Sequence, residues 1–301
     1  MAKIAVELEQ ELTRRRRDGS AGQTRPRVLA CGDGWTVADV VCTCGPQDRP
    51  YEERHDRVAI AIALAGSFQY RTSAGRGLMT AGSLLLGNYG ECFECQHQHG
   101  EGDRCVAFWY EPDYFERLST DTGLRRNQVR FKIPRVPPLR ELSAFVTRAS
   151  AGVEGAVNVS WEELAVTIGE RTARIASGAS AGTGGFPLNA EARVTRVIRA
   201  IDNHSGAGMS LGCLAREARL SPYHFLRTFK CVVGVTPHQY LLRVRLREAA
   251  SRLVATCDHV LDVALDSGFG DVSNFNRAFR QEFGVSPRVY RRAFEQDSRP
   301  R

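Results

Sequence analysis

Residues 214–240 read LAREARLSPYHFLRTFKCVVGVTPHQY, and residues 263–290 read VALDSGFGDVSNFNRAFRQEFGVSPRVY. The two stretches repeat one pattern of aromatic, basic, glycine and proline positions. The matching pairs, fifty positions apart, are Phe225/Phe275, Arg227/Arg277, Phe229/Phe279, Gly234/Gly284, Pro237/Pro287 and Tyr240/Tyr290. The earlier pair Ala215/Ala264 is forty-nine apart, so the second copy has one extra residue in its turn. Two copies are too few for a solenoid, and the repeat predicts two small helical units side by side.

Each copy contains the signals of a short helix, a tight turn and a second helix. Ser221 before Pro222 predicts a helix start, because serine caps the first turn and proline suits the first helical position. Thr236 before Pro237 predicts a long helix that connects the two copies. Arg227 and Lys230 lie among apolar positions of the second helix. This order is typical of helix-turn-helix units.

The net charge of +7 is confined to the part of the chain that carries the repeat. Residues 191–301 hold 18 Lys/Arg and 11 Asp/Glu, whereas residues 1–190 hold equal numbers of basic and acidic side chains. A locally basic domain suits a polyanion, and double-stranded DNA is the usual one.

Residues 198–294 resemble the DNA-binding domain of the AraC/XylS family of bacterial transcription regulators. The motifs that carry the resemblance are Leu214-Ala215, Ser221…Phe229-Lys230, Gly234…Pro237…Tyr240, Asp262-Val263-Ala264…Gly268-Phe269, Phe275…Arg277…Phe279-Arg280, and Gly284…Ser286-Pro287…Tyr290-Arg291. The resemblance implies seven helices in which one long helix joins two helix-turn-helix units. It also implies two recognition helices that enter successive major grooves.

Carried over by position, the resemblance assigns the DNA contacts. The groove-facing residues are Tyr223, His224, Leu226 and Arg227 in the first recognition helix, and Val272, Ser273, Asn274, Asn276 and Arg277 in the second. Arginine can pair with guanine, asparagine with adenine, and apolar side chains with thymine methyl groups. Phosphate contacts are expected from Lys230, Arg243, Arg280, Arg288, Arg291 and Arg292. Leu226 replaces the polar residue often found at its position, which argues against a hydrogen-bonded contact there.

The first half of the chain has a different pattern. Short apolar runs such as Val58–Leu64, separated by glycine turns, predict an all-β sandwich or barrel. Helical spacing after Pro138, and Ser160 with Glu163, predict two following helices. The fold class is therefore α+β in two domains. We expect a polar tail over 1–27, a sensor or dimerisation domain over 28–176, a flexible linker over 177–190 and a DNA-binding domain over 191–301. The family resemblance implies a cupin-like β barrel for the sensor domain.

A cluster of cysteine and histidine suggests a metal site in the first half. Cys95, His97 and His99 would share one face of a strand, and Cys105 could approach from its neighbour. Thiolate and imidazole ligands favour zinc or another soft transition metal. Redox sensing and simple packing of cysteine as a small apolar residue are the alternatives. His55 is expected at the surface.

These observations favour a sequence-specific transcription regulator, an activator in the pattern of the family, rather than an enzyme. Its first domain would sense a small molecule, a metal or a redox signal. The alternatives are a constitutive dimeric regulator without an effector and a cupin-type enzyme fused to a DNA-binding module. The expected partners are double-stranded DNA, RNA polymerase, an effector and a second copy of the chain. No run of eighteen apolar residues occurs and no signal-peptide core precedes the fold, so we expect a cytoplasmic protein without a membrane partner.

Overall fold

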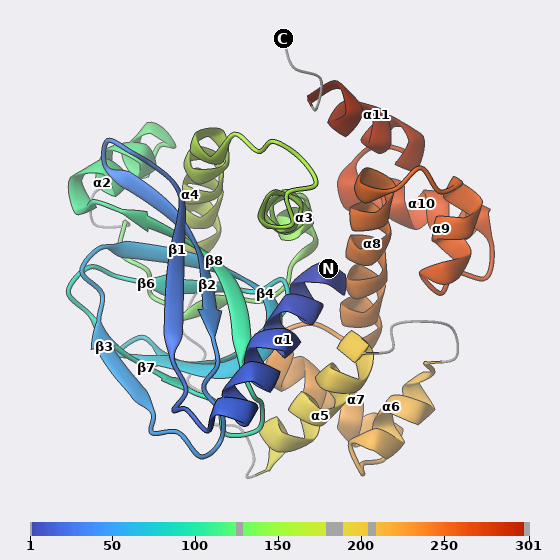
Figure 1. The fold of residues 1–301 in the computed structure, drawn as a ribbon, viewed down its shortest axis with the longest axis horizontal. Helices are drawn as coiled ribbons and strands as arrows, with labels where there is room; N and C mark the ends of the chain where they lie inside the picture. Colours follow the sequence, from blue (N-terminus) through green and yellow to red (C-terminus); the bar gives the residue numbers. More distant parts are fainter. Residues whose placement is uncertain (1, 125–128, 179–188, 204–208, 298–301) are drawn as a thin grey trace. The chain divides into compact units, whose positions relative to one another are not determined.

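The computed structural model describes residues 2–124, 129–178, 189–203 and 209–297. These residues divide into two compact units. The sheet unit comprises residues 5–137 and 160–188, and the helical unit comprises residues 1–4, 138–159 and 189–301. Figure 1 shows the strands of the first unit and the helices of the second. The predicted α+β fold class in two parts is confirmed.

The sheet unit is built from antiparallel strands. They are β1 (Thr24–Gly32), β2 (Trp35–Cys42), β3 (Tyr51–Arg54), β4 (Val58–Thr72), β5 (Gly75–Thr80), β6 (Leu84–Gly87), β7 (Cys92–Gln96), β8 (Asp103–Tyr110) and β9 (Arg135–Val136). One path runs in the order β1-β2-β8-β4-β6-β9, and a second group joins β3, β7, β4 and β5. The long strand β4 is common to both groups.

Strand β4 changes partners where its backbone bends. Its first half pairs with β8 and β6, and its second half pairs with β5 and β7. The pairing with β8 shifts register between Ala63 and Ala65, and Gly66 follows with φ +78°. A Cβ at Gly66 would lie 2.3 Å from the carbonyl oxygen of Gly102, so only glycine fits this bend. The bend folds the strands around an apolar interior that includes Phe68, Tyr70 and Met79.

The predicted polar tail is wrong for residues 2–18, which form helix α1 (Ala2–Asp18). Leu8 and Leu12 are buried on one side of it. Arg15 is one of four consecutive arginines, Arg14–Arg17. It donates to the Thr43 carbonyl and makes two bonds of 2.9 and 2.7 Å to the Asp48 carboxylate. The apolar residues of this segment, Leu8 and Leu12 among them, do recur at helical spacing, but charged residues dominate its composition.

Helices α2 (Pro112–Asp121) and α4 (Trp161–Ser177) complete the sheet unit. The two helices pack together, and α4 also contacts β1 and β2. The Tyr110 hydroxyl of β8 donates to the Ala165 carbonyl of α4 at 2.7 Å. Ser160 caps α4, as predicted, by accepting from the Glu163 amide.

The helical unit contains the repeat. Its helices are α3 (Ser143–Val153), preceded by the short helix η2 (Arg140–Leu142), then α5 (Ala190–Asn203), α6 (Leu211–Glu217), α7 (Pro222–Val233), α8 (Pro237–Ala255), α9 (Val260–Asp266), α10 (Val272–Phe283) and α11 (Pro287–Asp297). Helices α5 to α11 supply the seven helices implied by the family resemblance, with α8 as the long connector. A core of Phe269, Phe275, Phe279 and Tyr290 packs against α8 in the second half of the repeat.

Helix α3 groups with the helical unit, although the sequence predicted it within the domain 28–176. It packs against α8 and α10. The Ser143 hydroxyl donates to the Glu282 carboxylate of α10. An amphipathic pattern marks a buried face without identifying its partner, and this explains the difference. Residues 179–188 of the predicted linker lie outside the described residues.

None of the helices in the described parts of the chain is long and apolar enough to cross a membrane.

Candidate functional site

The two predicted recognition helices are α7 and α10, and each begins with a capped first turn. Ser221 accepts from the His224 amide, and Asp271 accepts from the Asn274 amide at 2.7 Å. Each helix ends at a glycine with positive φ, Gly234 at +89° and Gly284 at +80°. Such left-handed ends favour glycine because a Cβ would crowd the following carbonyl. The start and end of both helices are therefore set by local sequence.

The predicted DNA-contacting side chains lie on one side of each helix and the aromatic core on the other. Phe225, Phe229, Phe275 and Phe279 are fully buried. The predicted contact residues that are exposed are Tyr223, His224, Leu226, Arg227, Lys230, Ser273, Asn274, Asn276, Arg277 and Arg280. Val272 is half-buried. Each helix thus presents an exposed polar and basic face, as a groove-reading helix requires.

The paired arginines are held by different neighbours. Arg227 lies over the Tyr223 ring, with its guanidinium carbon 5.7 Å from the ring centroid. Arg277 instead donates to the Asn274 side-chain oxygen at 3.1 Å. In each case the neighbour is one helical turn earlier, so the guanidinium is partly oriented before any ligand arrives.

The extra residue of the second copy is located in the turn before α10. Leu220 bonds to the Ala215 carbonyl at 3.0 Å, and Phe269 bonds to the Ala264 carbonyl at 3.1 Å, so the two turns close alike. Ser221 then follows Leu220 directly as the cap of α7, whereas Gly270 separates Phe269 from the cap Asp271. Gly270 is therefore the inserted residue.

Two of the residues predicted to contact phosphates also bond within the helical unit. The Arg243 side chain is mostly buried and pairs with Glu282 at 3.3 Å. Arg291 donates to the carbonyls of Leu253 and Asp258 at 3.0 and 2.7 Å. Both arginines join α8 to its neighbours, a role that spacing along one helix does not reveal. Lys230, Arg280, Arg288 and Arg292 are exposed.

An open groove of about 1,120 Å³ adjoins the second recognition helix. It lies between residues of α9, α10 and α11. Its basic lining residues include Arg277, Arg280 and Arg288, and Asn276 and Ser286 add polar groups. Of the predicted base contacts, Val272, Asn276 and Arg277 line this groove. Ser273 and Asn274 are exposed on the same helix but do not line it.

A second cavity, of about 300 Å³, lies inside the sheet unit. It is lined by apolar side chains such as Phe68, Phe93 and Trp109, together with four cysteines: Cys42, Cys44, Cys95 and Cys105. His97 and Asp103 also line it. An apolar cavity with few polar groups is the usual form of a small-ligand site.

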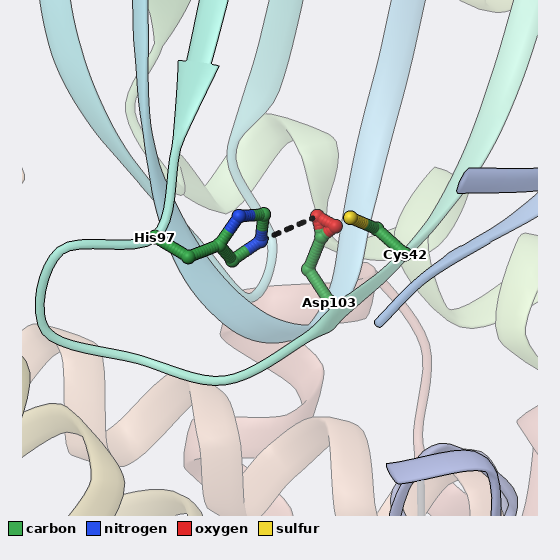
Figure 2. A group of neighbouring side chains, drawn as sticks. All are labelled: Cys42, His97 and Asp103. Carbon is green, nitrogen blue, oxygen red and sulfur yellow. Dashed lines mark ion pairs between the residues drawn. The ribbon is translucent and has the colours of Figure 1, made fainter. Parts of the chain in front are cut away.

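The predicted metal ligands are only partly brought together. Cys95, His97 and Cys105 line the cavity, but His99 is exposed and does not. Strand β7 ends at Gln96, so His97 and His99 lie in a loop and the strand periodicity that paired them does not apply. Figure 2 shows instead that His97 points toward Asp103 and Cys42. One ligand atom from each of these three buried residues lies within 4.8 Å of the others.

Sequence reasoning missed Cys42 and Asp103 because their contact depends on strand pairing. Cys42 ends β2 and is directly opposite Asp103, the first residue of β8. The two are sixty-one positions apart in the chain, and no local pattern connects them. An acidic residue and a cysteine at paired strand ends are visible only once the register is known.

The charges around His97 influence one another. Burial lowers the pKa of His97, but the neighbouring Asp103 carboxylate and Cys42 side chain outweigh it and raise the pKa to about 10. A bond to the Cys44 thiol and burial raise the pKa of Cys42, and the same bond lowers the pKa of Cys44. The buried site therefore attracts a positive charge, whether a proton or another cation.

His55 is buried, not at the surface as the sequence predicted. Its Nε2 lies 2.8 Å from the Tyr70 hydroxyl, which itself donates to the Leu86 carbonyl at 3.1 Å. Its ring stacks on Phe93 with centroids 4.1 Å apart. Burial lowers the pKa of His55 to about 4. It is a neutral packing residue of the sheet unit.

Known proteins match the repeat. Residues 214–293 match a family model described as a helix-turn-helix domain. The HTH-type transcriptional regulator Rv1931c of Mycobacterium tuberculosis is 39% identical over 90 residues, which are 30% of this chain and 35% of that protein. The HTH-type transcriptional activator RhaS of Escherichia fergusonii is 36% identical over 103 residues, 34% of this chain and 37% of that protein.

A solved structure, the DNA-binding domain of AdpA in complex with a target DNA, is 28% identical. It covers 35% of this chain and 94% of that chain, with a TM-score of 0.34. The chain thus spans a little over a third of the length of the curated relatives reported above.

Proposed function

Residues 214–293 form a helix-turn-helix domain of the AraC type, and from this premise we propose that the protein is a sequence-specific DNA-binding transcription regulator. The observation that carries the proposal is the pair of capped helices, α7 and α10, with aromatic cores beneath them and exposed polar and basic faces above. The matched relatives named above are transcription regulators.

In this proposal the two recognition helices read bases in the major groove. Arg227 and Arg277 pair with guanine, and Asn274 and Asn276 with adenine, because these side chains fit the hydrogen-bonding edges of those bases. Lys230, Arg280, Arg288 and Arg292 bind phosphates and set the register of the protein on the duplex. The excess positive charge of residues 191–301 supports the same partner.

The sheet unit would then act as the sensor, in a cupin-like arrangement, with the cavity of about 300 Å³ as its effector site. This cavity favours an effector-responsive regulator over a constitutive one. An effector that binds one arrangement of the protein better than another shifts the population of DNA-competent molecules. Contact with RNA polymerase and dimerisation would follow from a role in activation.

The test is binding of the full chain to DNA from its own upstream region, measured by fluorescence anisotropy. Arg227→Ala and Arg277→Ala should each weaken specific binding by about 1–3 kcal/mol while leaving binding to unrelated DNA less changed. Arg117→Ala removes an exposed arginine from α2 and is the matched control. Unchanged specific binding in both recognition-helix variants would contradict the assigned contacts.

A further inference from the structure

The group of Cys42, His97 and Asp103 has a composition that suits a metal ion. It combines one thiol, one imidazole and one carboxyl group, all from buried residues. Zinc accepts this mixture of sulfur, nitrogen and oxygen ligands, usually in tetrahedral geometry. A thiolate and a carboxylate would balance the charge of one divalent ion, so the loaded site would add no net charge to the interior.

The spacing also fits a metal better than it fits direct hydrogen bonding. His97 Nε2 and Asp103 Oδ1 are 3.6 Å apart, which is too long for a good hydrogen bond. Two ligand atoms about 2.0–2.2 Å from a tetrahedral zinc ion are separated by roughly 3.3–3.6 Å. Figure 2 shows the imidazole, the carboxylate and the sulfur facing one another.

An unpartnered atom points into this group. Within the described residues, His97 Nε2 is buried and has no hydrogen-bond partner. The His97 residue is only 5% exposed. A buried polar atom without a partner is costly and calls for an ion or ligand.

The three residues are held on a firm frame. Cys42 and Asp103 are paired across β2 and β8, and next to Asp103 the Arg104 guanidinium makes two bonds of 2.9 Å to Asp39 of β2. The loop that carries His97 is tied down because the Gly102 amide donates to the Cys44 carbonyl at 2.8 Å. The His97 ring stacks on Phe68, with centroids 5.7 Å apart. Such supporting contacts orient metal ligands.

The segment that carries Cys42 is fixed as well. Asp48 accepts from the amides of Gly45 and Gly22 at 2.6 and 3.1 Å, and Thr43 and Gln23 bond through their backbones. Cys44 lines the same cavity as Cys42 and raises the pKa of the Cys42 thiol. The cavity borders all three residues, so an ion can reach them.

We propose that the sheet unit binds one zinc-type divalent ion through Cys42 Sγ, an imidazole nitrogen of His97 and a carboxylate oxygen of Asp103. In the proposed regulator the sheet unit is the sensor, and this metal ion would be the signal that it senses. In that respect the metal proposal rests on the proposed function. Metal binding itself requires no DNA.

The test uses the full chain after treatment with chelator, titrated with Co²⁺ and then with Zn²⁺. We expect one Co²⁺ per chain, a thiolate-to-cobalt charge-transfer band, the visible absorption of tetrahedral cobalt, and displacement of cobalt by zinc. Cys42→Ser, His97→Gln and Asp103→Asn should each weaken uptake by about a hundredfold or more, since even supporting residues cost 10–100-fold. Cys42→Ser should also abolish the charge-transfer band.

Two controls are matched to the ligands. Cys95→Ser alters another thiol of the same cavity, and His99→Gln alters the exposed histidine of the same loop. Both should retain uptake within about threefold of the unaltered chain. Loss of uptake in a control equal to that in Cys42→Ser would overturn the ligand assignment. Cobalt uptake by the unaltered chain without a thiolate-to-cobalt charge-transfer band would also overturn it. That measurement does not depend on whether the ligand variants fold.

The same preparations are then tested for binding to DNA from the protein's own upstream region, which contains its expected operator. A chain that binds its operator but takes up no cobalt or zinc overturns the metal proposal alone. A chain that takes up the ion but does not distinguish its operator from unrelated DNA overturns the proposed function alone.

Discussion

Buried histidines in the sheet unit show how strongly surroundings determine a residue's chemistry. His55 packs on Phe93 and bonds to Tyr70, and burial lowers its pKa to about 4. His97 is equally buried, but the neighbouring Asp103 and Cys42 raise its pKa to about 10. The difference between the two pKa values comes from the groups that face each ring, with Asp103 nearest to His97, and not from the depth of burial.

The lowered pKa of His55 predicts an acid-sensitive sheet unit. The folded state binds a proton at His55 only near pH 4, whereas the unfolded chain binds it near pH 6.5. Stability from this residue is therefore complete above about pH 6.5 and is lost as the pH falls toward 4, by up to roughly 3 kcal/mol. The loss is expected in urea unfolding followed by tryptophan fluorescence, because Trp35, Trp109 and Trp161 all belong to the sheet unit.

His55→Gln is the informative variant, since glutamine can still donate to Tyr70 but does not titrate. Its free energy of unfolding should depend less on pH between 6.5 and 4 than that of the unaltered chain. Equal pH dependence of the two proteins would show that His55 does not contribute to the acid sensitivity.

At the scale of elements, the recognition helices are defined by their ends. The caps Ser221 and Asp271 and the left-handed glycines Gly234 and Gly284 set the same length for both helices. The two copies differ in length at the turn before the second helix, where the second copy contains the inserted residue Gly270. The two copies therefore present recognition helices of equal length after turns of unequal length.

Gly284→Ala should destabilise the helical unit by about 1–2 kcal/mol. An added Cβ there meets nothing within 4 Å, so the cost arises from the positive φ alone. Gly270→Ala is the matched control, because its Cβ also enters open space but its φ lies outside the left-handed region. Urea unfolding followed by circular dichroism compares the two, and an equal effect would remove the backbone explanation.

At the scale of the whole molecule, the chain is divided in a way that does not follow the sequence. Helix α3 packs on α8 and α10 and belongs to the helical unit. The segments before and after it in the sequence, residues 5–137 and 160–188 with α4, belong to the sheet unit. The Ser143–Glu282 bond, together with the Arg243–Glu282 pair, joins α3, α8 and α10. The helical unit is therefore larger than the repeat that it contains.

Ser143→Ala tests this division. Loss of a bond to the Glu282 carboxylate should destabilise the helical unit by about 1.5–3 kcal/mol. The tryptophan-reported unfolding of the sheet unit should change little, because Ser143 does not belong to it. If Ser143→Ala changed only the unfolding transition reported by tryptophan, α3 would belong to the sheet unit instead.

The helical repeat could be predicted from the sequence because its determinants are local. In the first copy Phe225 and Phe229 mark the core at helical spacing, Ser221 with Pro222 marks the helix start, and Gly234 marks the helix end, all within residues 221–234. Helix caps and left-handed glycine ends depend only on residues within one or two helical turns. The location of the exposed faces of α7 and α10 follows from the same spacing.

The roles of Arg243 and Arg291, the burial of His55 and the Cys42–His97–Asp103 group required the tertiary structure. Each depends on contacts between residues far apart in the chain, set by helix packing or by the register of β2 against β8. Such contacts leave no periodicity within one segment. By itself the sequence determined the ends and the exposed faces of α7 and α10, because these depend on local residues. Only the folded chain decided which side chains share a buried site, because strand pairing joins residues far apart in the chain.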